Sequence, residues 1–191
     1  MSFLSVSMAI ISRTPDRRGF LLLHRLRKRH WFQRYFHEGS DMYHAIVAAR
    51  IRELFRRLGR QDYALVLDSL ASKCEHSFMG DHALGGTRKT HAAIKRWYQR
   101  LPRVLPGLSF EIERIVVSGW PWATDIAVEW RDFGTTLDGS PFTNQGVHFI
   151  NLSWGKTTVI RIYCDTLLLK EVLSRNAACG LSEASARPIL D

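Results

Sequence analysis

The sequence predicts an α+β protein in which three helices pack on a strongly curved antiparallel sheet and a short helix follows the last strand. Two observations carry this prediction. In three stretches between residues 42 and 104 the apolar residues recur every three or four positions, which is the period of a helix. From 108 to 165 they recur at every second position, which is the period of a strand. Helices and antiparallel strands that are segregated along the chain form two packed layers.

The helices are expected over three stretches of the first part of the chain. The first stretch, 42–58, has one apolar stripe at spacings of four, three and four, formed by Val47, Ile51, Leu54 and Leu58. The second begins after Asp62, a residue suited to cap it, and carries Tyr63, Val66, Leu67 and Leu70 on one face. A short strand over 73–79 and a loop with three glycines then lead to a third helix over 88–104.

Four longer strands are expected after these helices, over 108–118, 125–133, 144–154 and 157–165. Asp138-Gly139 is a strong signal for a tight hairpin between the second and the third of them. In the second strand, alternation turns Ile126, Val128 and Trp130 toward one face. The same rule puts Asn144, Gly146, His148, Ile150, Leu152 and Trp154 on one face of the third strand, and Val159, Arg161, Tyr163 and Asp165 on one side of the fourth. A short helix over 166–176 ends the domain.

The charge of the chain is concentrated at its beginning. The 191 residues include 27 Lys and Arg against 18 Asp and Glu, which gives a formal net charge of +9. The whole excess lies in residues 1–60, and the rest is balanced. The composition is that of an ordinary globular protein, which excludes a collagen-like, disordered or disulfide-dense chain. The charge therefore says nothing about a ligand of the later part.

Three segments follow from this distribution. Residues 1–41 are expected to be a basic extension that is disordered or an artefact of the assigned start site, 42–176 a domain, and 177–191 a loose tail. The basic and aromatic residues within 13–36 suit nucleic acid or an anionic membrane surface, which is the alternative function of the extension. Three cysteines without a CxxC pair favour a reduced, cytoplasmic protein.

Four strings of the sequence carry a resemblance to a known family. They are the first helix pair closing on Asp62-Tyr63, the run from Phe78 to Arg88, Trp130 followed by the Asp138-Gly139 hairpin, and the run from Ile162 to Thr166. Together with the order of elements, these strings resemble the nuclear transport factor 2-like superfamily over about residues 43–175. Within it, the chain looks most like the SnoaL-like polyketide cyclase and ketosteroid isomerase branch. The resemblance implies a cone-shaped α+β barrel that needs no cofactor and forms a homodimer through its sheet.

An acid–base site is the main functional expectation. His148 shares its strand face with apolar residues, and an imidazole beside a cavity can exchange protons near neutral pH. Asp165 is placed to abstract a carbon-bound proton, while Tyr163 on the same face donates a hydrogen bond to the developing enolate. The resemblance implies such a His–Asp pair on the last two long strands. The alternatives are a core histidine for His148 and a helix cap for Asp165.

Six further residues are expected to contact a ligand: His76, Phe78, His82, Trp97, Trp130 and Asn144. For each there is a structural alternative, such as a loop-stabilising role for His76 and His82 or a core role for Trp130. The group of His76, Asp81, His82 and Asp165 lacks the spacing of a zinc site, so no metal is expected.

The leading hypothesis is a small-molecule-binding protein that catalyses acid–base isomerisation or cyclisation of an apolar or aromatic metabolite in a conical cavity. The alternative is a non-catalytic ligand-binding or dimerisation module of the same fold.

Overall fold

The computed structural model describes residues 39–191, and residues 42–191 form one compact unit. The extension expected over 1–41 therefore lies almost wholly outside the described residues. Residues 42–58 are helical. The later elements are α2 (Ala64–Ser69), β1 (Leu70–Phe78), β2 (Gly86–Arg88), α3 (His91–Val104), β3 (Ser109–Trp120), β4 (Ala123–Thr135), β5 (Pro141–Ser153), β6 (Lys156–Cys164), α4 (Thr166–Ala178) and η1 (Ser182–Ser185).

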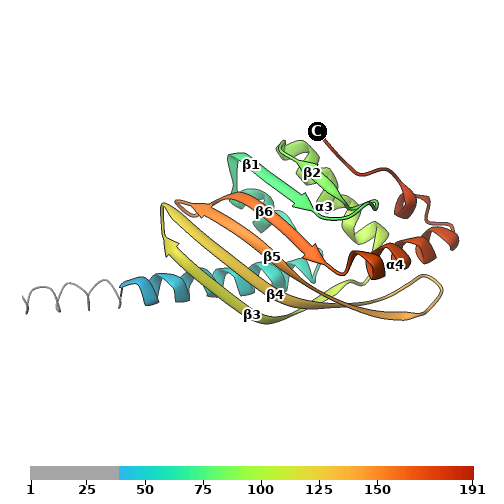
Figure 1. The fold of residues 1–191 in the computed structure, drawn as a ribbon, viewed down its shortest axis with the longest axis horizontal. Helices are drawn as coiled ribbons and strands as arrows, with labels where there is room; N and C mark the ends of the chain where they lie inside the picture. The colour runs from blue at the N-terminus through green and yellow to red at the C-terminus, as the bar shows by residue number, and fades with distance from the viewer. Residues whose placement is uncertain (1–38) are drawn as a thin grey trace, which may run out of the picture. The chain divides into compact units, whose positions relative to one another are not determined.

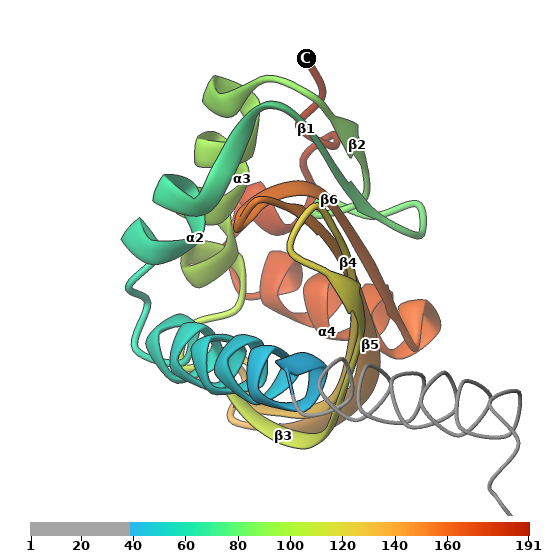
Figure 2. The same cartoon turned by 90° about the vertical axis from the view of Figure 1, so that its left-hand side faces the viewer.

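The six strands form one curved sheet in the order β2-β1-β6-β5-β4-β3 (Figure 1). The first helix, α2 and α3 lie on one side of this sheet, which bends around them (Figure 2). The α+β class and the curved sheet predicted from the sequence are thus confirmed. The Asp138-Gly139 hairpin is also confirmed, since it joins β4 and β5 with Gly139 at a φ of 86°.

The short elements differ from their predicted form. The second helix ends at Ser69, because Leu70 belongs to β1 and pairs with Thr157 of β6. The β1–β6 pair is parallel, so the sheet is mixed and not wholly antiparallel. The expected loop after β1 contains a further strand, β2, which pairs with β1 through residues 86–88. Helix α3 starts only at His91, where Thr90 caps it by accepting a hydrogen bond from the Ala93 N–H.

The alternating apolar residues of the strands lie on the face of the sheet that packs against the helices. Ile126, Val128 and Trp130 of β4 are buried, as the alternation predicts. In β6 the buried apolar residues are Ile160 and Ile162. The prediction that Tyr163 faces the cavity is therefore wrong. Ile160 and Ile162 lie on the inner face of β6, and because successive side chains of a strand point to opposite faces, Tyr163 lies on the outer face.

The C-terminal residues are held by specific contacts, whereas their composition predicts a loose tail. Glu183 of η1 pairs with Arg100 at 3.2 Å and Arg103 at 2.7 Å on α3. The Asp191 carboxylate accepts hydrogen bonds of 2.9 Å from the backbone N–H groups of Lys89 and Thr90. These contacts anchor residues 182–191 along α3. Among residues 39–191, no helix has the length and apolar character needed to cross a membrane.

Candidate functional site

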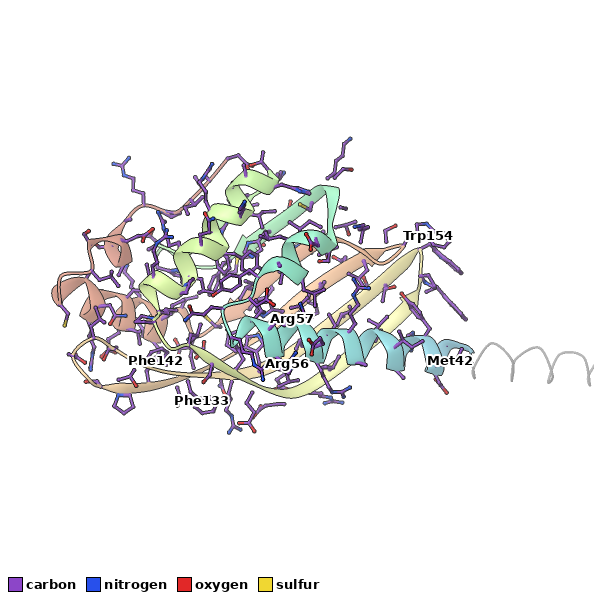
Figure 3. All side chains as sticks on the ribbon, turned by 180° about the vertical axis from the view of Figure 1, so that it is seen from behind. Met42, Arg56, Arg57, Phe133, Phe142 and Trp154 are labelled. Carbon is purple, nitrogen blue, oxygen red and sulfur yellow. The ribbon has the colours of Figure 1, made fainter. Side chains whose placement is uncertain are left out.

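A cavity lies between the first helix and the inner face of the sheet. Its outer chamber has a volume of about 190 Å³ and is lined mainly by apolar side chains of the first helix, β5 and β6. The chamber reaches the surface beside Ile46, Arg50 and Gly155, which are all exposed. This opening lies at the end of the unit where Figure 3 shows Met42 and Trp154.

A second, smaller chamber of about 40 Å³, called here the inner chamber, is lined almost wholly by buried residues. Leu58, Tyr98 and His148 line both chambers, so His148 borders both of them. The inner chamber brings together five of the predicted site residues: Phe78, Trp97, Trp130, Asn144 and His148. It also contains two polar residues that are not among the predicted ones, Asp132 and Cys164.

His148 is fixed by Trp130 on the neighbouring strand. The indole Nε1–H of Trp130 donates a buried hydrogen bond of 2.6 Å to Nδ1 of His148. Because Nδ1 is the acceptor, the single proton of the neutral ring is on Nε2. Burial lowers the pKa of His148 to about 3, which keeps the ring neutral near pH 7. His148 is therefore a neutral N–H donor and not a group that exchanges protons at neutral pH.

Gly146 makes this bond possible. It lies opposite Trp130 in the β4–β5 pair, and a Cβ there would approach the indole to 2.6 Å. The missing side chain lets the indole lie across β5 and reach His148, two residues further along the same face. A Cβ at residue 146 would also meet the backbone oxygen of Tyr163, so a larger residue there would displace the indole or the neighbouring strand.

Asp132 is the carboxyl group of the inner chamber. It lies on β4 two residues after Trp130, with only 6% of its surface exposed. Burial raises the pKa of Asp132 to about 6, although its Oδ1 accepts a 3.1 Å hydrogen bond from the backbone N–H of Asn144. A carboxyl group with a pKa near neutrality can both take and return a proton at physiological pH.

The other polar groups near Asp132 have structural partners. The side chain of Asn144 donates to the backbone carbonyl of Asp165 at 3.1 Å and accepts from the Gln145 N–H at 2.8 Å. Burial raises the pKa of the Cys164 thiol to about 12, so it stays protonated. Asp132 is left as the group of this chamber that titrates near neutral pH.

Tyr163 and Asp165 do not join His148. Tyr163 is 40% exposed on the outer face of the sheet, where its ring lies 6.1 Å from that of Phe149. The Asp165 carboxylate caps α4 by accepting hydrogen bonds from the backbone N–H groups of Leu167 and Leu168 at 3.0 and 3.1 Å. The predicted His148–Asp165–Tyr163 constellation is therefore not formed, and the capping alternative describes Asp165.

The histidines of the early strand and loop also lie away from the two chambers. His76 is fully buried behind Trp97, with their rings 4.5 Å apart. Nε2 of His82 bonds the backbone carbonyl of Met79 at 2.9 Å, which makes this ring part of the loop after β1. Within residues 39–191, no three His, Cys, Asp or Glu side chains are grouped in a way that could hold a metal ion.

The sequence contains a signal that points to Asp132. Extending the alternation of Ile126, Val128 and Trp130 by one step places Asp132 on the same buried face. The strand pattern therefore places a lone carboxylate on the buried face, which is where desolvation would raise its pKa. The hydrogen bond between Trp130 and His148 has no such signal, because it depends on the pairing register of two strands.

Known structures share this fold at low sequence identity. An NTF2-like protein of unknown function from Burkholderia pseudomallei is 20% identical, with a TM-score of 0.59 over 65% of this chain and 95% of that one. TerC, solved with polyporic acid, is 24% identical, with a TM-score of 0.56 and coverages of 65% and 95%. A candidate SnoaL-like polyketide cyclase from Jannaschia sp. CCS1 is 16% identical, with a TM-score of 0.54 and coverages of 69% and 91%.

The family is shown by a sequence model and not by these structures alone. No curated protein matches the chain. The model of the SnoaL-like domain matches residues 51–160, which is more than half of the chain and includes the first helix from Ile51, β4, His148 and the start of β6. The chain therefore belongs to the SnoaL-like domain family, within the NTF2-like superfamily.

Proposed function

We propose that this protein binds an apolar or aromatic metabolite in the two-chambered cavity and catalyses a proton transfer on it, as in an isomerisation or a cyclisation. The observation that carries the proposal is the position of Asp132 and His148 in one inner chamber. One group has a pKa of about 6, and the other is a neutral donor with a fixed tautomer. The pKa of Asp132 is raised and that of His148 is lowered, so Asp132 can exchange a proton near neutral pH while His148 stays a neutral hydrogen-bond donor. Such a pair of groups suits a division of roles in proton transfer.

Asp132 is the proton-transferring group in this proposal. Its carboxylate form removes a proton from a carbon of the ligand beside a carbonyl group, and the resulting acid returns the proton to another carbon. The low polarity of the chamber supports the step, because burial already raises the pKa of Asp132 toward the working pH.

His148 stabilises the oxyanion that this proton removal creates. The Nε2–H carries the ring proton, and no hydrogen bond from it to another described residue competes for it. A neutral donor of fixed orientation in a site with little water binds a developing enolate more strongly than it binds the ground-state carbonyl. His148 thus replaces Tyr163 in the role of hydrogen-bond donor.

The outer chamber suits the body of an apolar ligand. Its lining includes Val47, Ile51, Leu54 and Ile150, and Tyr98 lies between it and the inner chamber. TerC, a structural neighbour, has been solved with polyporic acid, which makes this compound a suitable probe of binding.

Binding is tested by titrating polyporic acid and a panel of aromatic ketones against the full chain and following tryptophan fluorescence. Leu54→Trp fills the outer chamber and is expected to weaken binding at least tenfold. Arg52→Trp places the same group on the exposed side of the same helix and is expected to leave binding unchanged. Equal binding by both variants, or none by the wild type across the panel, would refute the cavity as the ligand site.

Catalysis is tested by the uptake of solvent deuterium at acidic carbon positions of the bound ketones, measured by mass spectrometry. Asp132→Asn is expected to slow the exchange by about 10²–10⁴-fold while leaving binding intact. Asp165→Ser is expected to have the wild-type rate, because residue 165 is outside both chambers. Binding without exchange in the wild type would instead favour the non-catalytic ligand-binding module.

A homodimer through the outer face of the sheet completes the proposal. Val116, Phe149 and Tyr163, on three different strands, are 48%, 49% and 40% exposed on the face opposite the helices. A second copy would cover these side chains. Sedimentation equilibrium of the wild type and of Phe149→Lys tests this, and a monomeric wild type would refute it. A cytoplasmic location stays a prediction.

A further inference from the structure

Arg88 is a buried arginine without a carboxylate partner among residues 39–191. It ends β2 and has no exposed surface. Its Nη2 donates to the backbone carbonyl of Gly85 at 2.9 Å and to that of Gly86. Nε and Nη1 are buried and have no partner. Burial lowers the pKa of Arg88 only to about 10, so the guanidinium is charged at neutral pH.

His76 lies directly opposite Arg88 in the β1–β2 pair. It also has no exposed surface, and neither of its ring nitrogens has a partner. Both residues contact the indole of Trp97, with the His76 ring centroid at 4.5 Å and the Arg88 Cζ at 5.3 Å from the indole. Four unpartnered polar atoms of two side chains therefore occupy one region under α3.

The acidic groups nearby are engaged elsewhere. The Asp191 carboxylate bonds the N–H groups of Lys89 and Thr90 and the Thr90 hydroxyl. Glu75, the neighbour of His76 in β1, pairs with Lys89 at 3.7 Å and Arg161 at 3.6 Å. The charge of Asp191 favours the charged form of Arg88 through space, but no hydrogen bond joins Asp191 to Arg88 Nε or Nη1. Buried donors without an acceptor are costly, so these two N–H groups call for a partner.

We propose that Arg88 and His76 bind a small monovalent anion of about the size of chloride, held by Nε–H and Nη1–H of the guanidinium and by one ring N–H of His76. The proposal rests on the unpartnered donors of two fully buried residues that are paired across β1 and β2 and that contact the same indole. This site is separate from the two chambers, because neither Arg88 nor His76 lines them.

Thermal unfolding of the full chain at constant ionic strength tests the site, with sodium gluconate replaced stepwise by sodium chloride or bromide. An anion at about ten times its dissociation constant raises the midpoint by about 3–5 °C for a domain of this size, and above the dissociation constant the rise continues with the logarithm of the anion concentration. Arg88→Met is expected to abolish the halide dependence, and His76→Phe to weaken the apparent affinity at least tenfold. Arg114→Met removes an exposed arginine of β3 and is expected to respond like the wild type.

Crystals of the wild type grown in bromide provide a test that needs no variant. The expected result is an anomalous peak within about 3.5 Å of Arg88 Nη1 and a nitrogen of His76. The absence of this peak, or ordered water in its place, overturns the proposal. A midpoint that responds to halide equally in the wild type and Arg88→Met overturns it as well.

Discussion

The indole of Trp130 and the imidazole of His148 are joined by a hydrogen bond of 2.6 Å between side chains of two adjacent strands. The bond connects the buried apolar residues of β4 to His148, which borders both chambers. It determines which nitrogen of His148 carries the proton, so the chemistry available in the cavity depends on a contact that is part of the core.

Trp130→Phe is expected to remove the hydrogen bond that holds His148 in a single tautomer. The variant loses the donor and leaves Nδ1 buried without a partner, which costs about 1–3 kcal/mol of unfolding free energy in addition to the lost ring volume. The ¹⁵N shifts of His148 are expected to change from one tautomer with the proton on Nε2 to a mixture of two. Urea unfolding and ¹⁵N NMR measure the two effects.

Trp122→Phe is the matched control for this variant, because Trp122 is 56% exposed. A change within about 0.5 kcal/mol is expected there. A single Nε2–H tautomer retained in Trp130→Phe would show that the indole does not set the protonation of His148.

Asp132 is expected to make the protein less stable as the pH rises. Its pKa is about 6 in the folded protein against an ordinary value of 3.8, so between these values the folded state binds more protons than the unfolded state. The contribution of Asp132 to the unfolding free energy therefore falls with rising pH, by about 3 kcal/mol in all between pH values well below 3.8 and well above 6.

Asp132→Asn removes this contribution. The difference in unfolding free energy between the variant and the wild type is expected to shift in favour of the variant by about 3 kcal/mol between about pH 4 and pH 7. Urea unfolding at several pH values measures it. A difference that does not change over this range would mean that Asp132 titrates normally and would remove the basis for its role as a base.

His148 affects the pH dependence of the unfolding free energy with a sign opposite to that of Asp132. Its pKa is about 3 in the folded protein against an ordinary value of 6.5, so between these values the unfolded state binds more protons. Stability therefore falls by about 1.4 kcal/mol per pH unit as the pH drops from 6.5 toward 3, and the contribution is complete above pH 6.5.

His148→Gln is expected to abolish the acid-sensitive contribution and leave that of Asp132. Because the two contributions nearly cancel between pH 3.8 and 6 in the wild type, only the variants separate them. The pH dependence of the His148→Gln unfolding free energy is expected to slope downward with rising pH over that window. A His148→Gln slope over that window that is as flat as that of the wild type would contradict the neutral state of His148.

The sequence predicts the elements and much of the inner face. Ile126, Val128, Trp130 and His148 point inward because alternation along a long strand leaves only the choice of face. The prediction for Tyr163 is wrong because β6 has two sets of alternating residues, and either set could have formed the inner face. The branched apolar residues Ile160 and Ile162 determine the inner face, since burying them contributes more than burying the tyrosine.

The rest of the site depends on contacts between distant segments. Trp130 reaches His148 only because Gly146 is paired opposite it, and this register is a property of the β4–β5 pair. The raised pKa of Asp132 likewise requires the burial that α3 and the first helix provide through Leu58 and Leu101. A single strand cannot show such effects, although its pattern does show on which face Asp132 lies.

Asp165 is expected to affect stability and not chemistry. Its carboxylate satisfies two backbone N–H groups at the start of α4, and the loss of such a cap costs about 1 kcal/mol. Asp165→Ala is therefore expected to lower the unfolding free energy by about this amount, whereas Asp165→Ser keeps a capping oxygen and most of the stability. Urea unfolding measures both variants, and deuterium exchange into a bound ketone measures their chemistry. If Asp165→Ser retains its stability but loses exchange, then Asp165 takes part in proton transfer and Asp132 is not the sole carboxylate of the reaction.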